Sequence, residues 1–191
     1  MGSFEFAVES LLSISPAQWC QAYYVLSSII IVSIQVLPAD LRTALLDYGA
    51  RQQNSTRKSR IAWLLDCLQV PHSWFLHFYI LSLGLSAFWG WQYYTRGWVL
   101  TEIAQAQVKG SGNGLSMDIS QVRVAWGLMG LQGGRRLYES LFILRAGKSP
   151  MSSIHWLVGL SFYAAMSISI WIEGSGKTPT WPEFFPSNLH L

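Results

Sequence analysis

Residues 19–37 read WCQAYYVLSSIIIVSIQVL and contain no charged side chain. They lie inside a longer charge-free window, 10–39, and two further charge-free windows follow at 67–95 and 149–172. A helix needs about 20 mainly apolar residues to cross the hydrocarbon core of a bilayer. Each window is long enough, so the sequence predicts a protein that crosses a membrane several times.

The composition of the whole chain agrees with this prediction. Of its 191 residues, 51% are hydrophobic and only 12% are charged, whereas soluble domains carry about 25% charged residues. The ten Trp, eight Tyr and nine Phe are typical of membrane interfaces, where aromatic rings gather. A net charge of +3 without a basic module gives no indication of nucleic-acid binding. We therefore expect the lipid bilayer as a partner and no nucleic acid.

Basic residues are placed unevenly along the chain. None of the 13 Lys and Arg precedes Arg42, and five lie between Arg42 and Arg60. Short loops rich in Lys and Arg stay on the cytosolic side of a membrane. The sequence thus predicts that residues 40–60 form a basic cytosolic loop.

Together these patterns predict an all-α, polytopic membrane helix bundle with about four transmembrane helices. The expected spans are 19–37, 74–94, 122–144 and 153–172, and residues 1–191 form a single membrane domain. A polar segment joins the second span to the third, with loop chemistry at 110–114. Cys20 and Cys67 are too few for a disulfide framework, and we expect no metal site.

Arg135, Arg136 and Glu139 are unusual because they fall inside the third expected span. Insertion of one Arg or Lys at mid-membrane costs roughly 2.5–3.5 kcal/mol. Glu139 is three and four residues after the two arginines, so either can pair with it on one helix face. A guanidinium that remains available suits a phosphate, which it binds with two parallel hydrogen bonds. Two interpretations stay open: a polar site inside the bundle, or side chains that reach water at the helix end.

Four stretches of this sequence resemble one known family. Residues 131–142, LQGGRRLYESLF, are similar to the RRLxExLF signature of reductases in the steroid 5α-reductase superfamily. Residues 70–80, VPHSWFLHFYI, the pair Tyr48-Gly49, and residues 155–160, HWLVGL, resemble other segments of polyprenol reductases in the same order. Their order and spacing are most similar to the fungal polyprenol reductase branch.

The resemblance implies an NADPH-dependent reductase of the endoplasmic reticulum membrane, with several membrane spans. Such enzymes saturate the α-isoprene double bond of a polyprenoid, on the way to the dolichol used in protein N-glycosylation, or of a related terpenoid lipid. The implied fold is the N-terminal part of the steroid 5α-reductase fold. Arg135, Arg136 and Glu139 are the implied cofactor-binding residues, and His77 is the implied substrate-binding residue.

The implied catalytic residues differ from those of the steroid branch. That branch has a carboxylate just before a proline, and the matching position here is Gln69, which can donate a hydrogen bond but not act as an acid. The substrate-binding tyrosine of that branch falls near Gly133. Tyr138, one turn further, is the nearest phenol in the sequence, and we name Gln69 and Tyr138 as the catalytic candidates.

The chain ends after its fourth expected span, whereas the superfamily continues with further helices that carry most of its cofactor-binding residues. The resemblance therefore predicts a C-terminally truncated member, with a partner chain that supplies the missing helices. The alternative is a non-catalytic membrane protein of the same family that binds lipid or a partner. An unrelated small transporter or scaffold is the third hypothesis.

Overall fold

The computed structural model describes residues 14–39, 41–42, 68–110, 117–143 and 150–174, which are mainly helical. The helices are α2 (Pro16–Ile34), the 3-10 helix η2 (His72–Phe75), α5 (Leu76–Thr95), α6 (Trp98–Gly110), α7 (Ile119–Tyr138), the π-helix η3 (Glu139–Ile143) and α8 (Ser153–Gly174). Two short strands, β1 (Gln69–Val70) and β2 (Met151–Ser152), pair antiparallel. The predicted all-α class is confirmed for the described residues.

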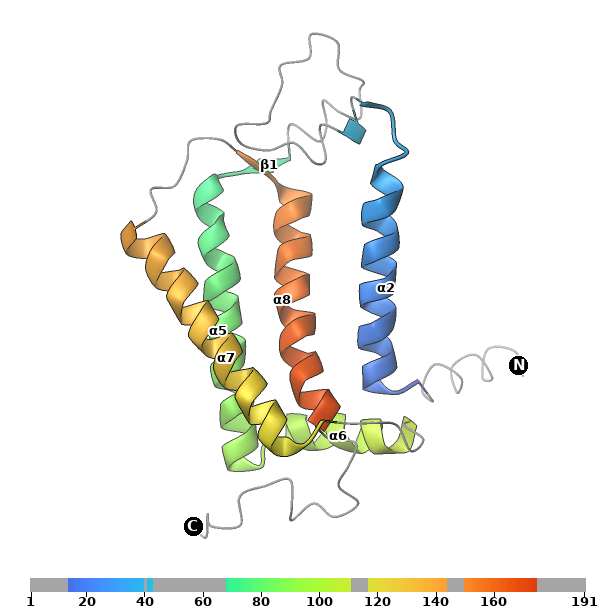
Figure 1. Ribbon diagram of the computed structural model, residues 1–191, viewed down its shortest axis with the longest axis vertical. Coiled ribbons are helices and arrows are strands. Elements are labelled where there is room, and N and C mark those ends of the chain that lie inside the picture. The colour runs from blue at the N-terminus through green and yellow to red at the C-terminus, as the bar shows by residue number, and fades with distance from the viewer. Residues whose placement is uncertain (1–13, 40, 43–67, 111–116, 144–149, 175–191) are drawn as a thin grey trace, which may run out of the picture.

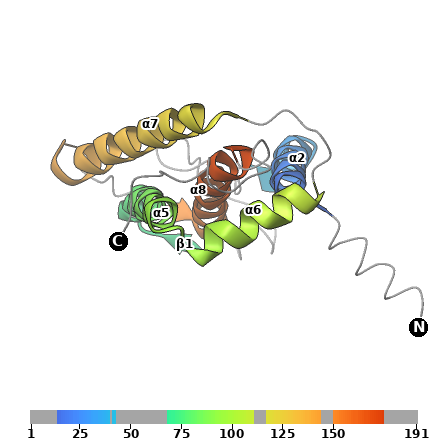
Figure 2. The same cartoon turned by 90° about the horizontal axis from the view of Figure 1, so that it is seen from below.

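Four long helices run along one direction, and α6 crosses one end of them (Figure 1). In this view α2 and α7 run upward, while α5 and α8 run downward, and α5 packs against both α7 and α8. We call the end with β1 and β2 the upper end and the end with α6 the lower end. Seen from below, α6 extends from the end of α5 to the start of α2 (Figure 2).

The strand pair fixes how α5 and α8 begin. Gln69 lies opposite Ser152 and Val70 opposite Met151, and the Ser153 N–H donates to the Leu68 carbonyl at 2.9 Å. The pair thus holds the starts of both helices at the same level, and both helices run downward in Figure 1. This register brings their aromatic residues together along their whole length.

A sharp corner joins α5 to α6. The C-cap of α5, Arg96, has the left-handed φ of 55° that commonly ends a helix, and the Gly97 N–H donates to the Gln92 carbonyl at 2.8 Å. The buried Gln92 side chain accepts a hydrogen bond from the Val99 N–H at 3.2 Å. It thus satisfies one of the backbone donors that a helix leaves unpaired at its N-terminus.

The main core lies at the lower end of the bundle. Its buried members come from α5, α6, α7 and α8 and are Trp89, Tyr93, Leu100, Val122 and Trp171. Beside it, the Trp126 indole N–H of α7 donates to the Ser86 carbonyl of α5 at 2.9 Å. In the upper half, Gly159 of α8 lies directly against the Phe78 ring of α5.

Helix α2 is attached at the edge of the bundle. It begins with a capping box, in which Ser15 and Gln18 each bind the other's backbone N–H. The Ala17 N–H donates to the Gln107 side chain of α6 at 2.9 Å, and Tyr23 hydrogen-bonds Ser161 of α8 at 2.7 Å. No residue within α2 is buried, as expected for a helix surrounded mainly by lipid.

The four expected spans all coincide with long helices, but the prediction of four membrane crossings is not confirmed. Among the described residues, two helices, α2 and α8, are long and apolar enough to cross a membrane by length and composition. Helix α7 is less apolar because it carries three arginines, and α5 ends in polar aromatic residues and Gln92. The basic loop 40–60, apart from residues 41–42, lies outside the described residues, as do residues 1–13 and 175–191.

Helix α6 was not expected. The sequence indicated a polar connecting segment there, and the residues 98–110 form 13 residues of helix instead. Its inner face, Leu100, Ala104 and Gln107, is buried, so its formation depends on contacts with the rest of the bundle.

Candidate functional site

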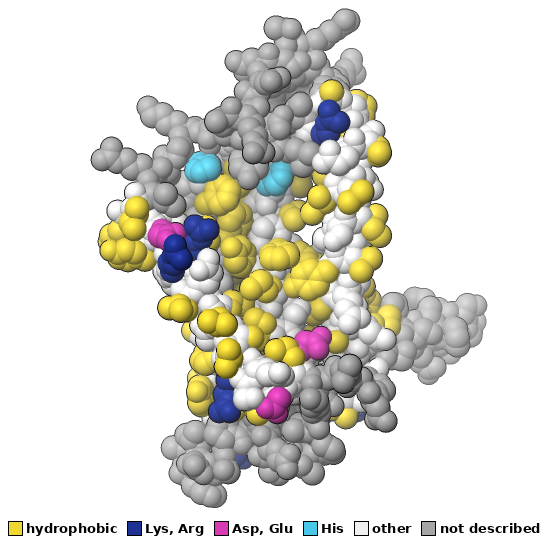
Figure 3. Space-filling model, viewed as in Figure 1, with side chains coloured by type: hydrophobic (Ala, Val, Ile, Leu, Met, Phe, Trp, Pro, Cys, Tyr) yellow, Lys and Arg dark blue, Asp and Glu magenta, His cyan; other side chains and the backbone are white. Residues whose placement is uncertain are grey.

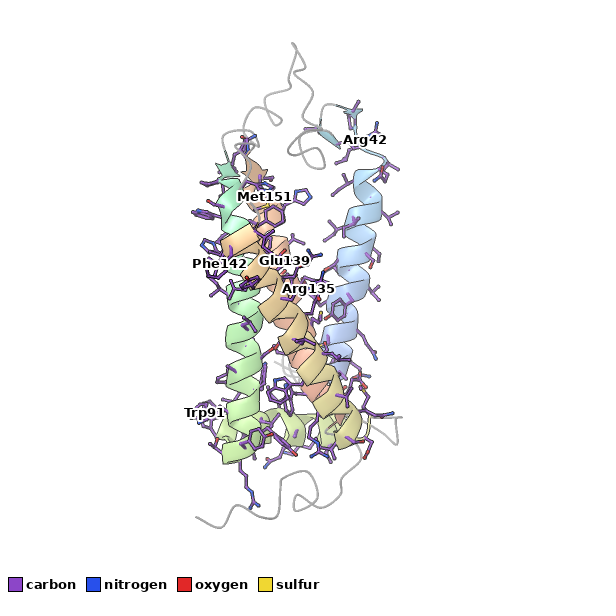
Figure 4. The ribbon with its side chains drawn as sticks, turned by 60° about the vertical axis from the view of Figure 1, so that its left-hand side comes forward. Arg42, Trp91, Arg135, Glu139, Phe142 and Met151 are labelled. Atoms are coloured by element: carbon purple, nitrogen blue, oxygen red, sulfur yellow. The ribbon has the colours of Figure 1, made fainter. Side chains whose placement is uncertain are left out.

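One charged cluster lies in the upper half of the bundle and consists of Arg135 and Arg136 of α7 and Glu139 of η3. Arg135 Nε lies 2.8 Å from Glu139 Oε1, and Arg136 Nη1 lies 3.1 Å from Glu139 Oε2. Figure 4 shows Arg135 and Glu139 together on α7, with Arg42 toward the upper end and Trp91 at the lower end. The predicted pairing of the arginines with Glu139 is confirmed, because spacings of three and four residues place them on neighbouring turns.

The cluster carries one net positive charge and keeps donors available. Glu139 accepts one hydrogen bond from each guanidinium, and a guanidinium has five N–H donors. The side chains of Arg135 and Arg136 are 70% and 49% exposed, while that of Glu139 is 20% exposed. This donor set fits an anion such as a phosphate, which arginine binds in bidentate geometry.

A π-helix begins at the cluster itself. The residues 139–143 form η3, so α7 changes its winding at Glu139. Single π-helical turns are rare and occur frequently at functional sites. The change of winding therefore supports a functional role for this end of α7.

Of the two interpretations, a polar site inside the bundle does not hold for Arg135, which is 70% exposed and points away from the buried side of α7. The buried residues of α7 are Val122, Met129 and Gly133, and a Cβ added to Gly133 would meet the Ser82 hydroxyl at 3.2 Å. Arg135 is two residues after Gly133, which is about 200° around a helix of 3.6 residues per turn. In the space-filling view, the blue and magenta side chains of the cluster lie on the open, largely apolar face of the molecule (Figure 3).

His77 lies in an aromatic group where α5 and α8 begin. Its ring centroid is 5.2 Å from that of Trp74 and 5.9 Å from that of Trp156, and the two indoles are 4.9 Å apart. Sequence reasoning named His77 but neither tryptophan. The spacing of three residues between Trp74 and His77 on one helical face could have indicated the first.

The two catalytic candidates lie in different places. Gln69 is half-buried in β1, paired with Ser152. Tyr138 is 57% exposed on α7, with its ring 5.0 Å from that of Phe142. The structure does not test either residue's role, so both roles stay predictions.

A different phenol packs inside the upper half of the bundle. The ring of Tyr163 of α8 stacks on that of Phe78 at 6.0 Å and lies 6.5 Å from that of Tyr79. Sequence reasoning did not name Tyr163, because its neighbourhood depends on the parallel packing of α5 and α8. A phenol can donate a hydrogen bond or a proton to an oxygen.

Metal ligation has no support in the described part of the chain. Within residues 14–39, 41–42, 68–110, 117–143 and 150–174, no group of three or more His, Cys, Asp or Glu side chains is placed to hold a metal ion. The described site is therefore one of guanidinium, carboxylate, imidazole and phenol groups.

Comparison with known proteins identifies relatives over about three quarters of the chain. It is 28% identical over 153 residues to a polyprenal reductase of Drosophila melanogaster. The matched region covers 73% of this chain and 44% of that protein. It is also 28% identical over 152 residues to a polyprenal reductase of Caenorhabditis elegans, with coverage of 75% and 47%. The chain thus spans less than half the length of these curated relatives. No family model and no solved structure matches it.

Proposed function

We propose that this chain belongs to a membrane-bound reductase that saturates the α-isoprene double bond of a polyprenal, in the formation of dolichol. The observation that carries the proposal is the similarity to two polyprenal reductases across most of the chain. The assignment to the fungal branch and the C-terminal truncation remain predictions from the sequence motifs.

We further propose that NADPH is the cofactor and that the arginine cluster receives its phosphates. When bound, NADPH supplies the hydride that adds to the β-carbon of the unsaturated substrate. Arg136 and Arg135 hold anionic oxygens, and Glu139 keeps the two guanidiniums in place through its two short contacts. The exposure of both arginines supports this role, since a phosphate group must reach them from water.

His77 is proposed to contact the oxygen-bearing end of the lipid, inside the aromatic group formed with Trp74 and Trp156. Gln69, Tyr138 and Tyr163 are the candidates for a hydrogen bond or a proton to the substrate. Tyr163 has the better support of the two phenols, because its ring packs against Phe78 and Tyr79 of α5, whereas Tyr138 is 57% exposed on α7.

The proposed topology has four spans, with residues 40–60 and the arginine cluster toward the cytosol, in the endoplasmic reticulum membrane. The described Arg42 lies at the upper end and the cluster in the upper half of the bundle (Figure 4), which supports a shared side. A partner chain that supplies further helices stays part of the proposal; the matched region covers 44% and 47% of the two relatives. We expect weak NADPH binding by the chain alone.

The test is to measure NADPH binding and reduction of a short-chain polyprenal by the purified protein, with and without Arg136→Ala. A hydrogen bond to a charged group contributes about 1.5–3 kcal/mol, and about 1.4 kcal/mol is a tenfold change in Kd. Since Arg136 is half-exposed, we expect at least a tenfold weaker Kd. Arg123→Ala is the matched control, because Arg123 is an exposed arginine at the other end of α7.

Both variants should unfold at the temperature of the wild-type protein. Robust turnover that survives Arg136→Ala would place the cofactor elsewhere. If the chain neither binds NADPH nor reduces the polyprenal, even when the unmatched part of one of the two polyprenal reductases is added, the non-catalytic alternative is favoured.

A further inference from the structure

The aromatic group of Trp74, His77 and Trp156 contains a buried hydrogen-bond donor without an acceptor. Among the described residues, Nε1 of Trp156 has no partner, and Nδ1 of His72, in η2 just before α5, has none either. An indole nitrogen can only donate a hydrogen bond. When it is buried unpaired, it loses its bond to water and gains nothing in return. A bound molecule that supplies an acceptor would explain such a group.

Packing holds the Trp156 indole in place. Its ring centroid lies 4.9 Å from that of Trp74 and 5.9 Å from that of His77. The strand pair aligns the starts of α5 and α8, and Gly159, one turn after Trp156, lies against the Phe78 ring. The N–H of Trp156 is therefore a donor at a fixed position where the two helices begin.

The aromatic group lies at nearly the same level of the bundle as the arginine cluster. Gly133 of α7 lies against Ser82 of α5, and α7 runs antiparallel to α5 (Figure 1). Arg136 is three residues after Gly133, which makes it level with Tyr79, three residues before Ser82. His77 is two residues further, or about 3 Å along a helix that rises about 1.5 Å per residue. A lipid whose oxygen end reaches the aromatic group thus has that end at the depth of the proposed phosphate site.

We infer that the Trp156 indole N–H binds the carbonyl oxygen of an unsaturated isoprenoid aldehyde, beside His77. The inference rests on the proposed function, from which it takes the aldehyde, and it adds the residue that recognises the oxygen. A carbonyl oxygen only accepts hydrogen bonds, which matches a group that only donates. Burial makes this match selective, because a hydrocarbon in the same place leaves the N–H unpaired. Trp156 is thus a specificity-determining residue of the site.

Nuclear magnetic resonance of the indole groups tests this inference, because an indole proton moves downfield when its N–H donates a stronger hydrogen bond. The full chain carries isotopically labelled tryptophan and is placed in phosphatidylcholine nanodiscs. The Trp156 signal is the one that Trp156→Phe removes. The probes are geranial, a short α,β-unsaturated isoprenoid aldehyde, and myrcene, an isoprenoid hydrocarbon with the same number of carbon atoms and no oxygen.

Trp74→Phe is the matched control, because it makes the same change in the neighbouring ring, whose nitrogen is not among the buried unpaired ones of the described residues. In each variant the affinity is followed on the indole signal that remains in the aromatic group. The Trp126 indole, which donates to the Ser86 carbonyl at the other end of the bundle, is the internal control. Its signal should stay in place in both variants, which shows that the bundle is intact.

We expect geranial to move the Trp156 signal downfield and myrcene to leave it in place. Trp156→Phe should weaken geranial binding about threefold to tenfold, the contribution of one hydrogen bond, and should leave myrcene binding unchanged. Trp74→Phe should change the affinities for both probes by the same factor.

Three results overturn the inference. The first is a Trp156 signal that geranial does not move; a signal that is already downfield without geranial shows that the N–H donates to water. The second is an equal shift with myrcene. The third is a preference for geranial over myrcene that Trp156→Phe leaves intact.

These measurements need neither NADPH nor turnover. A chain that binds geranial through Trp156 and reduces no polyprenal contradicts the proposed function alone. A chain that reduces a polyprenal equally well with Trp156→Phe contradicts the role of Trp156 alone.

Discussion

The contact between Gly159 and Phe78 predicts a strong effect of adding a single methyl group. A Cβ built on Gly159 would lie 2.7 and 2.8 Å from two ring carbons of Phe78, closer than carbon atoms can approach. The ring is 6% exposed and is held between the rings of Phe75 and Tyr163. It therefore has little room to move, and Gly159→Ala forces α5 and α8 apart.

The magnitude follows from two opposing contributions. Overpacking in a filled core costs about 1–3 kcal/mol, while replacing Gly by Ala inside a helix contributes up to about 1 kcal/mol of stability. The matched control is Gly84→Ala, because Gly84 is an exposed residue of α5 with open space around its Cβ position. Gly84→Ala therefore gains the stability that Ala gives a helix, without a contact between the added methyl group and a neighbouring ring. The two variants should thus differ by about 1–3 kcal/mol, or about 2–12 °C in Tm.

Thermal unfolding in detergent, followed by circular dichroism, measures this difference. Adding Phe78→Leu should reduce the cost of Gly159→Ala, because the smaller side chain leaves room for the methyl group. A double-mutant cycle reports this as a coupling energy above about 0.5 kcal/mol, the limit for independent sites. Equal Tm values for Gly159→Ala and Gly84→Ala, or additive effects of the pair, would refute the packing described for α5 and α8.

Two further predictions concern topology and the attachment of α2. Residues 54–56, Asn-Ser-Thr, form an acceptor sequence for N-glycosylation. Because the proposed topology places residues 40–60 in the cytosol, we expect Asn54 to stay unmodified in microsomes. A glycosidase-sensitive mass shift that Asn54→Gln removes would reverse the topology. Gln107→Ala should destabilise the chain by about 1–3 kcal/mol, since it leaves the Ala17 N–H without its partner. Gln105 is a half-buried neighbour on α6, and Gln105→Ala should have a smaller effect in the same unfolding assay.

The sequence located α2, α5 and α8 because each of them lies in a charge-free, apolar window. Their ends shifted by a few residues where local caps decide, such as Ser15 before α2. Helix α6 was missed for the opposite reason. Its residues include Glu102 and Lys109 and give no long apolar pattern, and its N-terminus is capped by Gln92 from α5. Such a tertiary cap has no signature in the residues of the helix.

The candidate site shows the same division between local and distant determinants. The contacts of Glu139 with Arg135 and Arg136 were predictable because all three residues lie on adjacent turns of one helix. The orientation of the cluster was not, because it depends on the close packing of Gly133 against Ser82 of α5. The place of Trp156 beside His77 depends in the same way on the register of α5 and α8.

The strand pair between Gln69–Val70 and Met151–Ser152 also has a consequence for the order of folding. About 80 residues separate the two strands, and at roughly 5–20 residues per second a ribosome takes about 4–16 s to make them. During that time α5 can pair with α7, its antiparallel neighbour, but not with α8. The aromatic surface around Trp74 and His77 therefore lacks its contact with Trp156 until α8 emerges, so α8 completes this part of the upper end of the bundle only after translation.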